Sequence, residues 1–126
     1  MFISVVIPTY NRRSILEKCL QALEHQDPSG EIENYEVVVV DDGSSDGTPN
    51  WLRQNAARFP HVRLVEQQHG GPAEGRNRGV DHSKGDVIVF IDSDLVVTSS
   101  FLASHARALS RRWNQQGDRL CFTYGA

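Results

Sequence analysis

Two aspartates, Asp92 and Asp94, follow an apolar run at residues 87–91 and are separated by a single serine. On an extended strand, side chains two residues apart point to the same side, so both carboxylates would face one space. They repel each other unless a cation or hydrogen-bond donors compensate. Oxygen ligands select a hard cation such as Mg²⁺ or Mn²⁺, which is often held by one or two carboxylates together with substrate phosphates. For an isolated pair, an aspartate-capped turn is the simpler interpretation.

Three further polar clusters also come after apolar runs, which lie at residues 2–7, 35–40 and 62–66. Those clusters are Thr9-Tyr10-Asn11-Arg12, Asp41-Asp42-Gly43-Ser44 and His69-Gly70-Gly71. Parallel strands would bring their carboxyl ends to one edge of a sheet, where open α/β folds bind their ligands. Convergence of all four clusters therefore favours a ligand site, with a metal at the two aspartates, over a simple turn.

Individual side chains in these clusters suit a nucleotide. Asp42 can accept a hydrogen bond from a base N–H or a ribose hydroxyl, whereas capping of the following loop is the expected role of one of Asp41 and Asp42. Tyr10 can stack on a base or simply line the edge of the sheet. Arg76, near the start of a predicted helix, can pair with phosphate through two hydrogen bonds.

The apolar pattern predicts the elements that hold these clusters. Buried strands are expected at residues 2–7, ended by Pro8, and at 35–40, 62–66 and 87–91, with a fifth beginning in 119–124. The first helix is expected to begin at Ser14, an N-cap paired with Glu17 in a capping box, and to end before Asp27. Further helices are expected from Thr48, from Pro72 to about His82, and over residues 99–115.

Alternating strands and helices predict an α/β fold with a mostly parallel, Rossmann-like sheet covered by helices on both faces. We expect residues 1–126 to form a single domain that is incomplete, because the sheet would stop at about its fifth strand. Gly75 and Gly79 weaken the third predicted helix, so this helix needs tertiary or ligand support.

Composition excludes several classes of protein. The 126 residues carry a formal net charge of −3, which gives no support to nucleic-acid binding through a basic face. Cys19 and Cys121 lie far apart outside any zinc pattern, and a reduced, cytoplasmic setting follows. The short apolar run near the N-terminus, with positive charges after it, leads us to expect neither a signal peptide nor a membrane span in it. No GxGxxG or GxxxxGK[ST] motif occurs, which argues against a dinucleotide-dependent oxidoreductase and a P-loop NTPase.

Four blocks of the chain together resemble family 2 glycosyltransferases of the GT-A fold. They are Pro8 to Arg12, Val38 to Thr48, Gly70 to Gly79 and Gly85 to Asp94, in family-like order and spacing. Glu74-Gly75 departs from the small-residue pair usual before the family arginine. The resemblance implies an inverting enzyme with a nucleotide-diphosphate-sugar donor, usually a UDP-sugar, and a divalent metal, Mg²⁺ or Mn²⁺.

The resemblance also implies roles for residues. Thr9 and Tyr10 would border the base, Asp42 would bind it at the uracil N3–H, and Arg76 would lie near base and phosphates. Asp92 would lie near ribose and metal, with Asp94 as the direct metal ligand. The implied nucleotide-sugar site comprises Pro8, Thr9, Tyr10, Asn11, Asp42, Arg76, Asp92, Ser93 and Asp94. The catalytic base of this family comes later, beyond residue 126, and none is assigned.

The sequence is therefore compatible with two alternative functions. The first is the donor-binding domain of a glycosyltransferase that serves a glycan, lipid or other hydroxyl acceptor, in the cytoplasm or at the inner face of a membrane. The second is an inactive nucleotide-sugar-binding module that lacks the base and acceptor site. Incomplete coverage of the sheet also predicts self-association or poor solubility.

Overall fold

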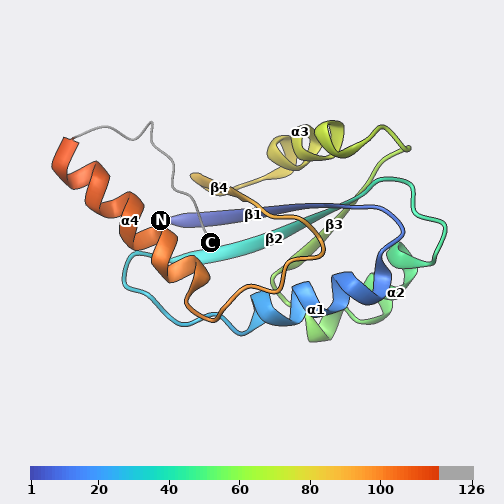
Figure 1. The fold of residues 1–126 in the computed structure, drawn as a ribbon, viewed down its shortest axis with the longest axis horizontal. Helices are drawn as coiled ribbons and strands as arrows, with labels where there is room; N and C mark the ends of the chain where they lie inside the picture. Colours follow the sequence, from blue (N-terminus) through green and yellow to red (C-terminus); the bar gives the residue numbers. More distant parts are fainter. Residues whose placement is uncertain (117–126) are drawn as a thin grey trace.

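The computed structural model describes residues 1–116 of the 126-residue chain. A four-stranded sheet in the order β3-β2-β1-β4 forms its centre (Figure 1), and every neighbouring pair is parallel. The strands are β1 (Phe2–Thr9), β2 (Asn34–Asp41), β3 (Val62–Glu66) and β4 (Val87–Phe90). The expected parallel α/β sheet is confirmed, while the strand expected to begin in 119–124 lies outside the described residues.

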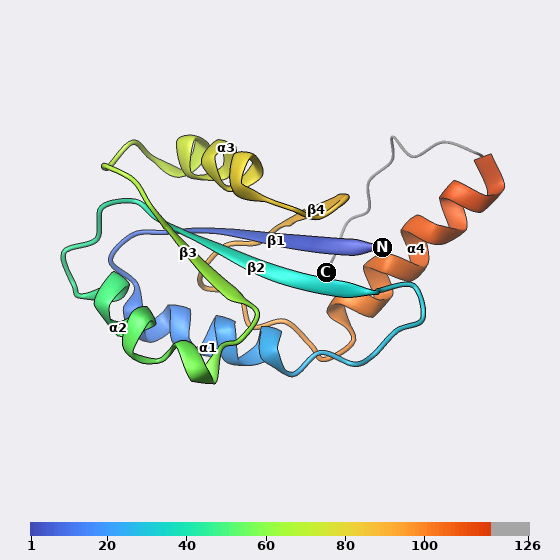
Figure 2. The same cartoon turned by 180° about the vertical axis from the view of Figure 1, so that it is seen from behind.

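Helices cover both faces of the sheet, as expected. They are α1 (Arg13–Glu24), α2 (Thr48–Gln54), α3 (Pro72–His82) and α4 (Phe101–Gln116), with a 3₁₀ turn at Ala56–Arg58. Helix α3 lies on one face, and α1 and α2 lie on the other together with the start of α4, an arrangement seen from both sides in Figures 1 and 2. Among residues 1–116, no helix combines the length and apolarity needed to cross a bilayer.

The strands alternate their side chains between two cores, which is why they are apolar throughout. The larger core lies under α1 and includes Ile3, Val5, Ile7, Val37, Val39, Leu16, Leu20 and Leu102. The smaller core lies under α3 and consists of Val6, Val38, Val40 and Val65, with Ile88 packed against it. Burial on both faces is typical of parallel sheets between helices.

Strand β1 continues through Pro8 to Thr9, so the expectation that Pro8 ends it is wrong. Its odd-numbered residues bond to β2, as the Asp42 amide does to the Thr9 carbonyl (2.9 Å). Its even-numbered residues bond to β4, and the last of these hydrogen bonds runs from the Ile91 amide to the Val6 carbonyl (3.2 Å). Because Pro8 comes after that point, its missing N–H costs the sheet no hydrogen bond.

The start of α1 also differs from the expected capping box. The helix begins at Arg13, Arg12 occupies the N-cap position without a side-chain cap, and Glu17 pairs with Arg58 (2.9 Å). The chain entering the helix is held instead by the loop after β2, where the Asp46 carboxylate accepts the Arg13 amide (3.1 Å). Side chains from another loop therefore do what a local cap usually does.

The same carboxylate begins α2. Thr48 was expected as the N-cap, but the helix includes Thr48, and Gly47 occupies the N-cap position with φ 84°. Asp46 Oδ1 accepts both the Thr48 amide (3.2 Å) and its hydroxyl (2.5 Å). Asp46 is therefore a structural residue that ties the starts of two helices to one loop.

Helix α3 approaches the sheet closely because two of its residues are glycines. A Cβ placed on Gly79 would lie 2.3 Å from Val6 Cγ1 and 3.3 Å from Val40 Cγ2, and one on Gly75 would lie 3.1 Å from Pro8 Cβ. The glycines that weaken the isolated helix thus allow its packing, which is the tertiary support expected for them. This close approach sets the position of every residue on α3.

A buried polar network holds the far end of α3. Ser4 Oγ donates to Glu36 Oε1 (2.8 Å) and accepts the Gly85 amide (2.8 Å). The Lys84 amide donates to the same carboxylate oxygen (2.8 Å), and Arg63 pairs with Glu36 Oε2 (3.0 Å). Because the buried Ser4 and Glu36 side chains bond to the backbone of residues 84 and 85, they fix the α3–β4 turn against the sheet.

We expect Gly79→Ala to destabilise the protein although alanine favours helices. The propensity gain is about 1 kcal/mol, whereas overpacking a buried site costs about 1–3 kcal/mol, and a contact of 2.3 Å with buried Val6 lies at the severe end. Urea denaturation should show a net loss of roughly 1–2 kcal/mol.

Gly30→Ala is the matched control, because a Cβ there meets no heavy atom within 4 Å. Its free energy of unfolding should stay within about 0.5 kcal/mol of the parent. Equal stability of the two variants would contradict the close approach of α3 to the sheet.

Candidate functional site

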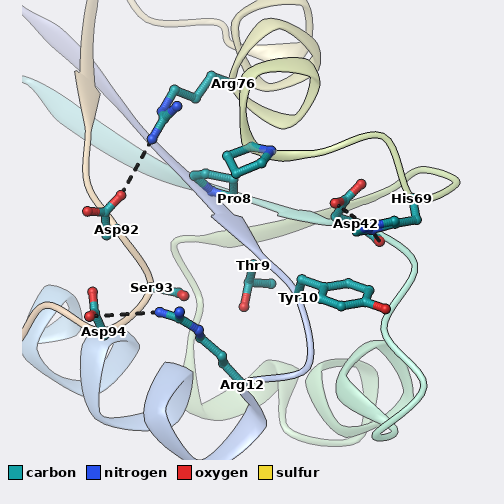
Figure 3. Close-up of a pocket in the computed structure, with 11 residues that line it drawn as sticks. Pro8, Thr9, Tyr10, Arg12, Asp42, His69, Arg76, Asp92, Ser93 and Asp94 are labelled. Carbon is teal, nitrogen blue, oxygen red and sulfur yellow. Dashed lines mark hydrogen bonds and ion pairs between the residues drawn. The ribbon is translucent and has the colours of Figure 1, made fainter.

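A pocket of about 470 Å³ opens beyond the carboxyl ends of the strands (Figure 3). Its volume lies in the usual range for small-molecule sites, about 300–1,000 Å³. The lining residues are Pro8, Thr9, Tyr10, Arg12, Asp42, His69, Pro72, Arg76, Asp92, Ser93 and Asp94. The residues expected from the sequence therefore line this pocket with one exception, Asn11, and Arg12, His69 and Pro72 line it in addition.

Asn11 does not line the pocket but joins two loops next to it. Its amide donates to Ser44 Oγ (2.8 Å), and its Oδ1 accepts the Ser45 amide (2.8 Å). Asn11 is also the one non-glycine among the described residues with positive φ, at 51°, a conformation that asparagine tolerates better than most residues. Asn11 therefore turns the chain between β1 and α1, and its expected contact with the nucleotide sugar stays a prediction.

Asp42 is buried at the end of β2, and its carboxylate holds the loop of residues 67–71. Oδ1 accepts the Gln67 side-chain amide (2.7 Å) and the Gly70 amide (2.8 Å), while Oδ2 accepts the Gly71 amide (3.1 Å) and lies 2.9 Å from His69 Nδ1. All four lone-pair sites of an ionised carboxylate are thus engaged.

These donors also set the charge of Asp42. Burial by itself raises the pKa of the carboxyl, but the hydrogen bonds from Gln67, Gly70 and Gly71, together with the His69 charge, outweigh it and lower the pKa below its usual value. The neighbouring Asp41 accepts the Ser44 amide (2.9 Å). As expected for one member of the pair, Asp41 therefore caps the loop that follows.

Tyr10 and His69 form an aromatic wall on one side of the pocket. Their ring centroids lie 4.4 Å apart at an interplanar angle of 35°. The Tyr10 side chain is partly exposed, and His69 is held by Asp42. Sequence reasoning left His69 out of the site, although it belongs to one of the four polar clusters. The wall offers a flat, accessible surface that suits an aromatic ligand group.

The Asp92-Ser93-Asp94 segment is a turn rather than the end of a strand. Strand β4 ends at Phe90, and the Leu95 amide donates to the Asp92 carbonyl (3.2 Å). The two carboxylates face different arginines (Figure 3): Asp92 Oδ1 lies 3.6 Å from Arg76 Nη2, and Asp94 Oδ2 lies 3.8 Å from Arg12 Nη1. The strand-based reason for that expectation is therefore wrong, because residues 92–94 are not extended, although both side chains still line one pocket.

These ion pairs are exposed to solvent, so each contributes about 0–1 kcal/mol. They offset the negative charge of the turn, and they leave four charged side chains free to rearrange around a ligand. Ser93 between them is buried, which anchors the turn.

The donor set limits how a metal could bind. Among residues 1–116 no three His, Cys, Asp or Glu side chains are grouped so that they could hold a metal ion. Burial, with a smaller effect of Asp94, raises the pKa of the nearby Cys19 thiol to about 12, so this thiol is a poor ligand. Asp92 and Asp94 fit a hard divalent cation that completes its shell with ligand phosphates and water.

Comparison with known proteins identifies relatives of one kind. The model of the family described as Glycosyl transferase family 2 matches residues 4–116. An uncharacterized glycosyltransferase of Bacillus subtilis, YfnE, is 36% identical over 83% of this chain and 26% of its own length. Glycosyltransferase AglE of Haloferax volcanii is 39% identical over 74% of this chain and 30% of its own length. The chain thus spans less than a third of these relatives.

Solved structures with the same fold include two glycosyltransferases with bound donors. TarS of S. aureus in complex with UDP-GlcNAc has a TM-score of 0.74 and 31% identity, over 90% of this chain and 32% of that chain. The mannosyltransferase PcManGT of Pyrobaculum calidifontis, in complex with GDP-Man and Mn²⁺, has a TM-score of 0.70 and 35% identity. The match covers 80% of this chain and 30% of that chain. The GT-A architecture expected from the sequence is confirmed by these neighbours.

We expect Asp42→Asn to lower stability by about 1–3 kcal/mol at neutral pH, because the asparagine nitrogen would face N–H donors. The folded pKa of Asp42 is lowered, so its stabilisation is complete above the unfolded value of about 3.9 and is lost as the pH falls through the folded value. Denaturation at pH 7 and pH 3 should therefore show the difference between parent and variant shrinking at low pH.

Asp81→Asn, on the exposed face of α3, removes the same charge and should change stability by less than about 0.5 kcal/mol. A constant difference between the parent and Asp42→Asn at both pH values would show that the ionised carboxylate does not hold the loop.

Proposed function

This chain belongs to glycosyl transferase family 2, and we propose that its pocket binds the nucleotide diphosphate of a sugar donor, with a UDP-sugar as that donor. One observation carries the proposal. The aromatic wall of Tyr10 and His69 and the charged turn at Asp92 and Asp94 lie on opposite sides of one pocket (Figure 3). A nucleoside diphosphate has the same arrangement, with an aromatic base at one end and phosphates at the other.

The base end would receive the uracil. Tyr10 offers a partly exposed ring for stacking, with Thr9 and Pro8 between the base and the metal end. Asp42 would contact the base at its N3–H by exchanging one of its present donors. Its bond with His69, whose side chain is 61% exposed, is the most accessible of these. Uracil is preferred over guanine because TarS, the neighbour that covers more of this chain, is in complex with a uridine nucleotide.

The diphosphate end would combine arginines with a metal. Arg76 extends from α3 toward the pocket and pairs with Asp92, from which position it can hold phosphate through two hydrogen bonds. Asp94, with Asp92, would hold Mg²⁺ or Mn²⁺, whose chemistry is to offset charge on the departing diphosphate. The presence of Mn²⁺ with GDP-Man in PcManGT supports this choice.

For the whole protein we propose an inverting transfer to a hydroxyl group of a glycan, lipid or other acceptor, following the family pattern. Such a transfer needs a base to deprotonate the acceptor. The carboxylates that line this pocket, Asp42, Asp92 and Asp94, each have another partner in the described part of the chain. Because the roles proposed above for these carboxylates, in holding the base and the metal, leave none of them to deprotonate an acceptor, a second candidate is that residues 1–126 are a single donor-binding domain that binds without transferring. Turnover by this chain alone would exclude it.

We expect UDP with Mn²⁺ to raise the melting temperature of the protein, because a ligand that binds only the folded state stabilises it. At one hundred times Kd the gain is about 2.7 kcal/mol, which differential scanning fluorimetry detects. Asp94→Ala should abolish the part of the shift that depends on Mn²⁺ and retain the part due to UDP alone.

Glu33→Ala removes an exposed carboxylate that pairs with the N-terminus, far from the pocket, and should leave the shift intact. An unchanged melting temperature of the parent with UDP and Mn²⁺ would rule out the assignment of the donor site.

A further inference from the structure

Arg12 is a pocket residue whose function the site described above leaves open. Its Nη1 lies 3.8 Å from Asp94 Oδ2, and the two side chains are 49% and 54% exposed. In Figure 3 the Arg12 side chain extends from the start of α1 toward the acidic turn. A positive charge therefore stands beside the carboxylate proposed as the direct metal ligand.

The loops around the pocket fix the direction of Arg12. Asn11 before it has φ 51° and bonds to Ser44 and Ser45, and the amide of Arg13 after it bonds to Asp46. The Arg12 carbonyl accepts the Leu16 amide (2.8 Å), which makes it the last residue before α1. With its backbone held on both sides, Arg12 has its side chain in the pocket lining.

The next residue shows that this direction is specific. The Arg13 guanidinium carbon lies 5.7 Å from the centroid of the Trp51 ring, and Arg13 does not line the pocket. Two adjacent arginines thus have the same charge but different surroundings. Of these two arginines, Arg12 is the one that pairs with Asp94.

We propose that Arg12 couples the binding of the metal to the binding of the diphosphate. Without nucleotide, its guanidinium competes with a divalent cation for Asp94 and repels that cation. With nucleotide, the guanidinium moves to a diphosphate oxygen, a partner that arginine binds strongly, and Asp94 becomes free for the metal. This inference rests on the proposed function, since it assumes that the pocket takes a nucleotide diphosphate.

Coupling of this kind is reciprocal. If UDP raises the affinity for Mn²⁺, then Mn²⁺ raises the affinity for UDP by the same factor. The Arg76–Asp92 pair has a similar geometry, at 3.6 Å, so some coupling should remain when Arg12 is removed. In this proposal Arg12 acts on the metal indirectly, as a positioning residue that releases Asp94, and binds the diphosphate directly.

The test uses Arg12→Gln and two ligands, Mn²⁺ and UDP. Electron paramagnetic resonance of free Mn²⁺ measures metal binding without nucleotide, and isothermal titration measures UDP binding with and without Mn²⁺. We expect the variant to bind Mn²⁺ alone about two- to fivefold more tightly, the range that an exposed ion pair supports. UDP should bind about tenfold more weakly, since a charge-assisted bond to phosphate is lost.

Two further variants separate charge from structure. Arg13→Gln removes the neighbouring charge and should match the parent in both titrations. Arg12→Lys keeps the charge without the planar fork, so it should match the parent for Mn²⁺ alone and fall between parent and Arg12→Gln for UDP. Melting temperatures report whether each variant is folded, and Arg12→Lys provides the test if Arg12→Gln is not.

The outcomes distinguish this inference from the proposed function. If the parent binds UDP with Mn²⁺ but Arg12→Gln shows parental affinities for both ligands, the coupling role is wrong and the donor site stands. The same holds if Arg12→Gln binds Mn²⁺ more weakly than the parent. If the parent does not bind UDP with or without Mn²⁺, the proposed function fails and the inference fails with it.

Discussion

Negative charge gathered at the carboxyl edge of a parallel sheet is the constraint on which the rest of the site depends. The topology brings Asp42, Asp92 and Asp94 to one pocket, where uncompensated carboxylates would repel one another. The chain resolves this in two ways. Asp42 is buried and receives hydrogen bonds from the loop at 67–71, whereas the two others remain exposed and pair with exposed arginine side chains. The first arrangement gives a rigid wall, and the second gives charges that a ligand can rearrange.

The arginines can serve this purpose only because their helices are held firmly. Gly79 lets α3 approach Val6 and Val40, and the Glu36 network fixes the end of the helix where it turns into β4. These contacts set the distance between Arg76 and Asp92. At the start of α1, side chains from the loop after β2 perform the same task for Arg12. Contacts made away from the pocket, between α3 and the sheet and between the start of α1 and the loop after β2, thus determine where positive charge lies in the pocket.

The sequence predicted the parallel sheet and most of the pocket lining, because both follow from which residues end each apolar strand. The prediction failed for side chains in the segments that follow a strand, because strand geometry no longer sets their direction there. Period-two alternation no longer applies at Asp92 and Asp94, which lie in a turn, and the positive φ of Asn11 turns that side chain away from the pocket and sends Arg12 into it. Ser14 was misjudged because a carboxylate from another loop, Asp46, replaced the local cap, and Pro8 because its missing N–H lies beyond the last bond to β4.

The central claim is that the turn at residues 92–94 anchors a metal and a diphosphate together. Nuclear magnetic resonance with Mn²⁺ as a paramagnetic probe tests it most directly, because Mn²⁺ broadens the amide signals of residues near it. In the presence of UDP, broadening should centre on residues 92–95 and extend to 8–12 and 72–76, and it should be weaker with Mn²⁺ alone. Broadening centred elsewhere, or independent of UDP, would contradict the account.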